Sequence, residues 1–135
     1  RKLCEIEAYS PIDNVSEITA RTNDEGFDTV FEEYLKISKF NKKDAILILS
    51  VGGGSLKKKV SINLINSIKF AKKKKALVLS IIGKKDGYAA LNSTYSIIIS
   101  PKNEKLLTPI SESYQSIIWH LIVSHPELQT NKTKW

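Results

Sequence analysis

Apolar residues along the chain alternate between short continuous runs and stretches with helical spacing. The runs at 45–49 and 76–82 are bounded by polar turns, as is typical of strands buried on both faces of a parallel sheet, and residues 95–100 predict a third strand. Three intervening or following stretches are predicted to be helices: 56–74, 88–92 and 109–123. This order predicts an α/β domain with a parallel sheet and right-handed crossovers.

The N-terminal part of the chain has a less regular pattern. Residues 5–10 predict a short strand, residues 11–14 predict a turn, and residues 15–20 are ambiguous. Residues 22–26 (Thr-Asn-Asp-Glu-Gly) have the polar chemistry of a helix start, so a helix is expected over 27–39.

The composition is that of one ordinary soluble domain: 135 residues, 41% hydrophobic and 26% charged. No apolar run approaches the roughly 20 residues that a membrane-spanning helix needs. Cys4 is the only cysteine, which excludes an internal disulfide, and no signal peptide is visible. A cytoplasmic location without membrane contact is therefore expected. Because the chain starts at Arg1 and contains no methionine, we expect that an N-terminal portion is missing.

The net charge of +7 raises the question of a polyanionic partner. Arg1 and Arg21 are the only arginines among 21 basic residues, whereas recognition of base edges depends heavily on arginine. The lysine runs 57–59 and 72–75 keep a nucleic-acid binder as an alternative, which predicts steeply salt-dependent binding. Since no aromatic residues are interleaved with these lysines, the solvated face of a helix is favoured and nucleic acid is not an expected partner.

Residues 50–55 (Ser-Val-Gly-Gly-Gly-Ser) connect the first apolar run to the predicted helix at 56–74. A loop that enters a helix presents free backbone N–H groups, and glycines let the backbone approach an anion closely. Ser50 and Ser55 add a hydroxyl group at each end. The loop therefore predicts an anion site, with a flexible turn as the alternative. Its spacing matches neither standard nucleotide motif, so no nucleotide cofactor is expected.

Four segments together resemble the phosphoheptose isomerases, a family with the sugar isomerase (SIS) domain: 22–26, 50–55, 83–87 and Trp119-His120-Leu121. The resemblance covers nearly the whole chain. It implies a three-layer αβα sandwich with a doubly wound, flavodoxin-like parallel sheet, as a single SIS domain over 1–135 without its N-terminal helices. The implied reaction interconverts sedoheptulose 7-phosphate and a glycero-manno-heptose 7-phosphate through an enediol, in heptose or lipopolysaccharide biosynthesis.

The resemblance also implies where the sugar phosphate binds. The family's serine-rich loop holds the phosphate group, which corresponds to Ser50, Val51, Gly52 and Ser55. That loop typically reads Ser-Thr-Ser-Gly-Asn-Ser, so this chain departs from it at Val51, Gly52 and Gly54. The loss of a hydroxyl at Gly52 leaves more of the binding to backbone N–H groups.

Two further polar residues match a substrate-contacting pair of the family. Asn23 and Asp24 correspond to its Asn-Asp pair, although a helix cap is an equal alternative for Asp24. The neighbouring Arg21 is expected to form a surface ion pair rather than to contact an anionic ligand.

The last predicted helix carries the implied catalytic residues. His120 matches the family's histidine, an acid/base group and a possible Zn²⁺ ligand, and Glu112 matches a position, usually glutamine, that contacts metal and substrate. From the residues alone, a helical histidine beside Trp119 is more often structural. Gln115 is a weaker polar neighbour, and His125 suits a helix C-terminus.

Several of the family's catalytic elements lie on an earlier helix and an Asn-Gly-Gly-Ser type loop, which this chain lacks. The favoured hypothesis is nevertheless an aldose–ketose isomerase that forms a homotetramer with sites between subunits. The alternative is a non-catalytic SIS module that binds a sugar phosphate as a regulatory ligand, favoured by the departures at Gly52 and Glu112.

Overall fold

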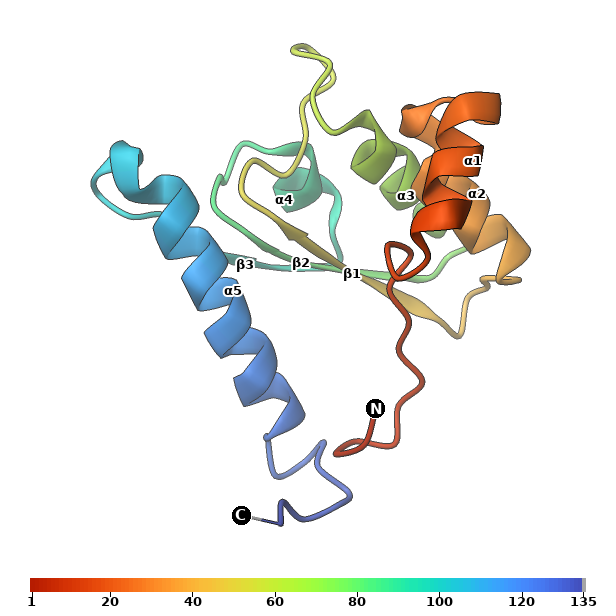
Figure 1. The fold of residues 1–135 in the computed structure, drawn as a ribbon. Coiled ribbons are helices and arrows are strands. Elements are labelled where there is room, and N and C mark those ends of the chain that lie inside the picture. The colour runs from red at the N-terminus through yellow and green to blue at the C-terminus, as the bar shows by residue number, and fades with distance from the viewer. Residues whose placement is uncertain (135) are drawn as a thin grey trace.

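The computed structural model describes residues 1–134 and has an α/β fold around a three-stranded sheet (Figure 1). The strands β1 (Ala45–Ser50), β2 (Leu77–Ile82) and β3 (Tyr95–Ile98) lie in the order β1-β2-β3, and neighbouring strands run parallel. The strands predicted at 45–49, 76–82 and 95–100 are confirmed and differ only at their ends.

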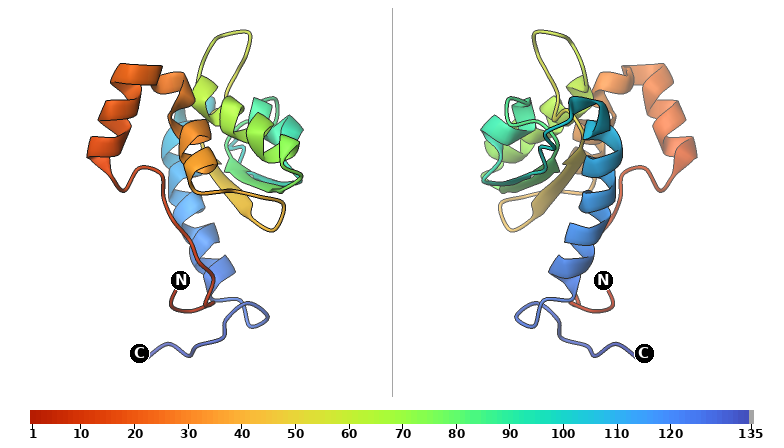
Figure 2. Two further views of the ribbon diagram at one scale, coloured as in Figure 1. Left: turned by 90° about the vertical axis from the view of Figure 1, so that its right-hand side faces the viewer. Right: turned by 90° about the vertical axis from the view of Figure 1, so that its left-hand side faces the viewer.

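Helices lie on both faces of this sheet. The helices after the strands are α3 (Ile62–Lys73), α4 (Tyr88–Asn92) and α5 (Leu107–Val123), the last preceded by a 3-10 turn, η2 (Glu104–Leu106). α3 and α4 cover one face and α5 lies against the other, so the predicted layered α/β architecture is confirmed (Figures 1 and 2). Within residues 1–134, no helix is long and apolar enough to cross a membrane.

The hydrophobic core lies between the sheet and α3. Ile48, Val78 and Ile82 alternate along β1 and β2, so their side chains share one face and pack against Ile68 and Ala71 of α3. Each fully buried aliphatic side chain of this kind contributes about 1.5–3 kcal/mol to stability. The cluster is completed by residues at the ends of neighbouring elements: Phe40, Ala76 and Ala89.

The opposite face of the sheet is only partly covered. Leu47 and Leu49 of β1 are each 46% exposed, and Leu77 and Ile97 on the same face are 48% and 45% exposed. α5 crosses this face near the carboxyl ends of the strands, close to the buried Ile81. The prediction that β1 is buried on both faces is therefore wrong, because α5 alone does not cover the whole face.

The segment before the first helix has no regular structure. Residues 5–10, predicted as a strand, are irregular, because they have no partner strand in the described chain. The turn predicted at 11–14 is confirmed by a hydrogen bond of 3.2 Å from the N–H of Asp13 to the carbonyl oxygen of Ser10.

Helix α1 (Val15–Glu25) includes the ambiguous residues 15–20. It begins at Asn14, whose side chain accepts a hydrogen bond from the N–H of Glu17. Residues 22–26 therefore end a helix instead of starting one, because Gly26 adopts a positive φ of 86° and terminates α1.

The helix predicted over 27–39 is present as two pieces. A 3-10 turn, η1 (Phe27–Thr29), leads into α2 (Val30–Ile37), which packs against α3. The side-chain amide of Asn66 on α3 donates to the carbonyl oxygen of Asp28 at 3.0 Å, which fixes η1 to α3.

The largest departure from the sequence prediction lies between β1 and α3. Residues 56–61 were predicted to be helical, but Ser55 and Val60 form an antiparallel bridge with two backbone hydrogen bonds of 3.0 Å. We call residues 55–60 the lysine hairpin, because Lys57–Lys59 form its tip. It projects from the molecule above the sheet (Figure 1).

The backbone conformation explains why the helix begins late. Lys59 and Ser61 adopt positive φ values of 51° and 52°, which interrupt a right-handed helix. The prediction that these lysines belong to the solvated face of a helix is thus wrong for 57–59, whereas Lys72 and Lys73 do lie on α3.

The two ends of the described chain lie side by side (Figures 1 and 2). The N–H groups of Thr130 and Asn131 both donate to the carbonyl oxygen of Leu3, at 2.8 and 3.0 Å. The buried Cys4 places its Sγ 3.3 Å from the carbonyl oxygen of Val123 at the end of α5. These contacts tie the N-terminal segment to α5.

Candidate functional site

The glycine loop, residues 50–55, lies at the carboxyl end of β1. The N–H of Gly53 donates to Ser50 Oγ at 3.1 Å and closes the start of the loop. Gly53 and Gly54 adopt φ values of 69° and 82°, which favour glycine over other residues. Backbone conformation therefore accounts for glycine at both positions.

The carbonyl side of the loop is attached to α4. The N–H groups of Tyr88 and Ala89 donate to the carbonyl oxygens of Gly54 and Gly53, at 2.9 and 2.8 Å. These bonds satisfy donors in the first turn of α4. The N-terminus of α4 is consequently occupied by the glycine loop itself.

The loop after β2, residues 83–87, forms the second wall. The N–H of Gly83 donates to the carbonyl oxygen of Val51 at 2.9 Å. Gly87 lies against Gly52 so closely that an added β-carbon would overlap the Gly52 carbonyl oxygen. Glycine at 87 is therefore required by close backbone approach.

The loop is open at Gly52, which is exposed, whereas Gly54 is buried against Ile65. Neither the N–H of Gly52 nor that of Gly54 donates a hydrogen bond within residues 1–134, and a β-carbon at Gly52 would meet nothing within 4 Å. Free amides at the carboxyl edge of a parallel sheet are suited to an anion. The predicted help from a helix N-terminus directly after the loop is absent, because α3 begins only at Ile62.

The two serines of the loop differ in their surroundings. Ser50 accepts the N–H of Gly53, and Ser55 Oγ accepts the N–H of Lys58 at 3.2 Å, which caps the lysine hairpin. Both side chains are partly exposed, and each hydroxyl hydrogen can still be donated. Ser55 is thus shared between the glycine loop and the hairpin.

The lysine hairpin adds positive charge next to this loop. The side chains at Lys57–Lys59 are exposed, and none forms an ion pair in the described part of the chain. Unpaired ammonium groups raise the local potential and favour an anionic ligand.

Asn23 and Asp24 lie on the last turn of α1 and are exposed. No hydrogen bond or ion pair joins either of them to the glycine loop among residues 1–134. The alternative reading of Asp24 as a helix cap at a helix start is wrong, because Asn14 caps α1. Contact of Asn23 and Asp24 with substrate stays a prediction.

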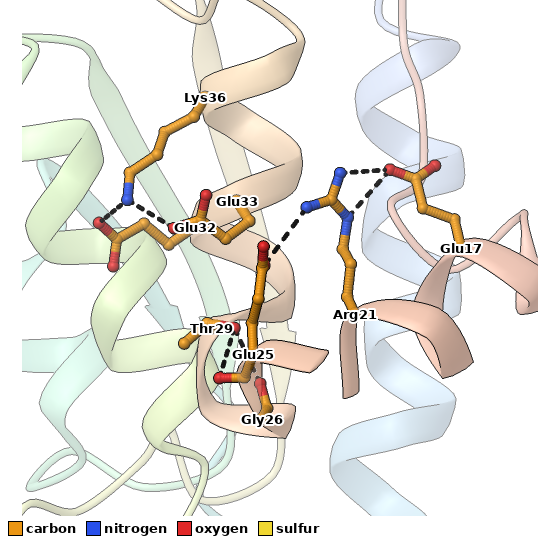
Figure 3. A network of polar contacts seen from close by, with 8 residues as sticks. All are labelled: Glu17, Arg21, Glu25, Gly26, Thr29, Glu32, Glu33 and Lys36. Carbon is orange, nitrogen blue, oxygen red and sulfur yellow. Dashed lines mark hydrogen bonds and ion pairs between the residues drawn. The ribbon is translucent and has the colours of Figure 1, made fainter. Parts of the chain in front are cut away.

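Arg21 is held by neighbouring acids on its own helix (Figure 3). Its guanidinium lies 2.9 Å from Glu17 and 3.7 Å from Glu25, so the expected surface ion pair is confirmed. On α2, hydrogen bonds from Lys36 to Glu33 and Glu32 raise the pKa of that lysine (Figure 3). The charges of Arg21 and Lys36 are thus paired with acids on their own helices.

Glu112 and His120 are both exposed on α5. The His120 ring stacks on that of Trp119, with centroids 3.7 Å apart. Within residues 1–134, no polar contact connects His120 or Glu112 with the other or with the glycine loop. Their catalytic roles therefore stay predictions.

The described residues do not form a complete zinc site by themselves. Structural and catalytic zinc sites use three or four protein ligands, whereas residues 1–134 contain no group of three His, Cys, Asp or Glu side chains able to hold a metal. His120 and Glu112 supply at most two such ligands. Any further ligands would have to come from outside this part of the chain.

Gln115, which the sequence predicts only as a weaker polar neighbour of the catalytic residues, connects α5 to the glycine loop. Its Nε2 donates to the carbonyl oxygens of Ser50 and Ile81, at 3.1 and 2.9 Å, and the side chain is buried. It thereby fixes the edge from which the glycine loop starts. Both polar and apolar residues surround it on the helix, so the sequence carried no clear signal of this role.

Comparison with known proteins supports the resemblance at the level of sequence. No protein-family model matches the chain. It is 35% identical over 92 residues to a phosphoheptose isomerase from Buchnera aphidicola, which covers 68% of this chain and 44% of that protein. It is also 35% identical over 115 residues to the lincomycin biosynthesis protein LmbN of Streptomyces lincolnensis, covering 84% of this chain and 41% of that protein.

Solved structures support the resemblance at the level of fold. Phosphoheptose isomerase GmhA from Neisseria gonorrhoeae superposes with a TM-score of 0.69 over 87% of this chain and 61% of its own length, at 22% identity. A phosphoheptose isomerase from Francisella tularensis superposes with a TM-score of 0.65 over 84% of this chain and 58% of its own length, also at 22% identity. The chain resembles phosphoheptose isomerases in sequence and in fold. It spans less than half the length of the two curated relatives.

Proposed function

We propose that the chain is the sugar-phosphate-binding domain of a cytoplasmic aldose–ketose isomerase of the phosphoheptose isomerase type. The proposed reaction interconverts sedoheptulose 7-phosphate and a glycero-manno-heptose 7-phosphate, the step that the resemblance implies for heptose biosynthesis. The observation that carries this proposal is the glycine loop, which presents the exposed, unpaired amide of Gly52 at the carboxyl edge of the sheet.

The phosphate group of the sugar would lie against this loop. Ser50 and Ser55 can each donate a hydroxyl hydrogen, and the exposed lysines 57–59 lie on the hairpin that continues from Ser55. Charge-assisted hydrogen bonds to a phosphate are about twice as strong as neutral ones. Such contacts anchor one end of an open-chain sugar and leave its carbonyl end for the proton transfer.

The isomerisation moves a proton between adjacent carbons through an enediol and needs an acid/base group near them. We assign this role to His120, with Glu112 beside the substrate. Because both side chains are exposed and neither makes a polar contact with the glycine loop within residues 1–134, the proposal includes a homotetramer in which α5 completes the site of another subunit.

The test uses the full-length protein and sedoheptulose 7-phosphate in heavy water. An enediol mechanism predicts solvent deuterium in the aldose product, detected by NMR. His120→Ala should lower turnover by about 10²–10⁴-fold, the typical contribution of a general acid/base group. The matched control is His125→Ala, since His125 lies beyond α5, where its Nδ1 accepts the N–H of Glu127. Normal turnover in His120→Ala would remove His120 from the mechanism.

A second candidate is a non-catalytic SIS module that binds a sugar phosphate as a regulatory ligand. The absence of polar contacts between the glycine loop and His120 or Glu112 within residues 1–134, together with the departure at Gly52, favours it. It predicts tight binding of the sugar phosphate by the full-length protein without deuterium incorporation or isomerisation.

A nucleic-acid function has the least support. The lysine runs 57–59 and 72–75 lie at opposite ends of α3, which has 12 residues and therefore spans about 18 Å. Two runs so separated do not form one short basic surface. Steeply salt-dependent binding of a polynucleotide would restore this function.

A further inference from the structure

A basic cavity lies beside the glycine loop. It has a volume of about 380 Å³ and is lined by the loops that follow β2 and β3, together with η2 and the first residue of α5, Leu107. Both loops leave the carboxyl ends of parallel strands, the edge at which ligands bind in open α/β sheets. The volume is within the range of small-molecule sites.

The lining carries an excess of positive charge. The charged residues of the lining are three lysines, Lys84, Lys85 and Lys102, and two acids, Asp86 and Glu104. Within residues 1–134, none of these five side chains forms an ion pair. The lysines are therefore not neutralised by the acids next to them, although all five charges contribute to the potential in the cavity.

This cavity is distinct from the glycine loop, but the two share a wall. Gly83 and Gly87, the ends of the loop after β2, contact Val51 and Gly52 of the glycine loop. Residues 83–86 line the cavity. The loop at residues 83–87 thus contacts the glycine loop through its two end residues and lines the basic cavity with the residues between them.

We propose that this cavity binds a small phosphate monoester or inorganic phosphate, as a second anion site separate from the sugar-phosphate site proposed at the glycine loop. Lys84 and Lys102 come from the two different loops, so an anion between them is held from two directions. A dianionic phosphate group matches several lysine donors better than a carboxylate does, because it offers more charge and more acceptor oxygens.

The experiment titrates ¹⁵N-labelled full-length protein with inorganic phosphate at constant ionic strength and follows backbone amides by NMR. Saturable shifts are expected at the amides of residues 84–86, Ser100 and Lys102, which line the cavity. Shifts at residues 52–54 are fitted separately and report on binding at the glycine loop. The proposal for the cavity and the proposal for the glycine loop are therefore tested independently.

The decisive variant is Lys84→Gln/Lys102→Gln, which should weaken phosphate binding at the cavity by about tenfold and leave binding at residues 52–54 within about twofold. The matched control is Lys42→Gln/Lys43→Gln, which removes the same charge from an exposed turn before β1. The proposal is overturned if shifts at the cavity do not saturate, or if the two double variants bind phosphate there equally well. Either result would mean non-specific charge attraction only.

Discussion

Gly52 and Gly87 lie against each other where β1 and β2 end, but they tolerate side chains very differently. At Gly52 an added β-carbon would point into open space, and φ there is not positive. At Gly87 it would overlap the carbonyl oxygen of Gly52, which belongs to the backbone and cannot move aside easily. Glycine is thus a packing requirement at 87, whereas at 52 it leaves room for a ligand or a hydroxyl.

We therefore expect Gly52→Ser to leave the free energy of unfolding within about 0.5 kcal/mol of the wild-type value, as for ordinary surface substitutions. Gly87→Ala should lower it by about 1–3 kcal/mol through overpacking. Urea denaturation measures both. Equal stabilities for the two variants would contradict the close approach of Gly87 to Gly52. If a sugar phosphate binds at the loop, the hydroxyl of Gly52→Ser should also strengthen that binding, measured by calorimetry.

Gln115 attaches α5 to the ends of two strands by hydrogen bonds. Replacement by methionine, Gln115→Met, keeps much of the volume but leaves the carbonyl oxygens of Ser50 and Ile81 without this donor. Loss of a partner by a buried polar group costs about 1–3 kcal/mol, so the urea midpoint should fall accordingly. The exposed neighbour provides the control, Ser116→Ala, which should change little. Unchanged stability of Gln115→Met would mean that α5 is held mainly by apolar packing.

At the scale of elements, the lysine hairpin is the main feature of the connection between β1 and α3. Its two backbone hydrogen bonds between Ser55 and Val60 hold the tip lysines away from the sheet. The hairpin continues directly from the glycine loop, so its charge acts where the phosphate is proposed to bind.

Neutralising the tip with Lys57→Gln/Lys58→Gln/Lys59→Gln should raise the apparent KM for a sugar phosphate severalfold and flatten its dependence on salt, because exposed charges attract an anion over about one Debye length, roughly 10 Å at 0.1 M salt. The turnover number should change little. Steady-state kinetics at several salt concentrations test this.

The control for this series is Lys73→Gln/Lys74→Gln/Lys75→Gln, which removes the same charge at the far end of α3. If both triple variants change KM and its salt dependence equally, the effect belongs to net charge and not to the hairpin.

At the scale of the whole molecule, the two faces of the sheet are unequal. The face covered by α3 and α4 holds the core, whereas the other exposes nearly half the surface of Leu47, Leu49, Leu77 and Ile97. Exposed apolar side chains gathered on one face are typical of a surface that is covered by other protein or that promotes association.

We expect the 135-residue chain to self-associate as its concentration rises, because this face is exposed. Leu47→Ser/Leu49→Ser should reduce the association, measured by sedimentation velocity. The control is Leu91→Ser, since Leu91 is 72% exposed on α4, away from this face. Association that is the same in all three proteins would mean that the sheet face does not mediate it.

Several elements could be read from the sequence because their signals are local. The strands at 45–50 and 77–82 are continuous apolar runs between polar turns, and the position of the glycine loop after β1 follows from that order. The resemblance to phosphoheptose isomerases was also contained in short motifs of the sequence. Local chemistry and the order of elements were thus sufficient for the fold class and for the position of the glycine loop.

Other features could not be read from the apolar pattern of the sequence. Residues 56–61 follow a helical apolar pattern, yet Ser55 pairs with Val60 and the backbone at Lys59 and Ser61 adopts positive φ. Residues 5–10 have strand-like composition but no strand to pair with. The burial of Gln115 and the basic cavity beside the glycine loop arise only when the loops after β2 and β3 meet α5. Propensity determined the strands and most helices, and the lysine hairpin was decided by a local backbone pairing that the apolar pattern does not reveal. The exposed face and the basic cavity were decided by tertiary packing, because each depends on residues far apart in the chain.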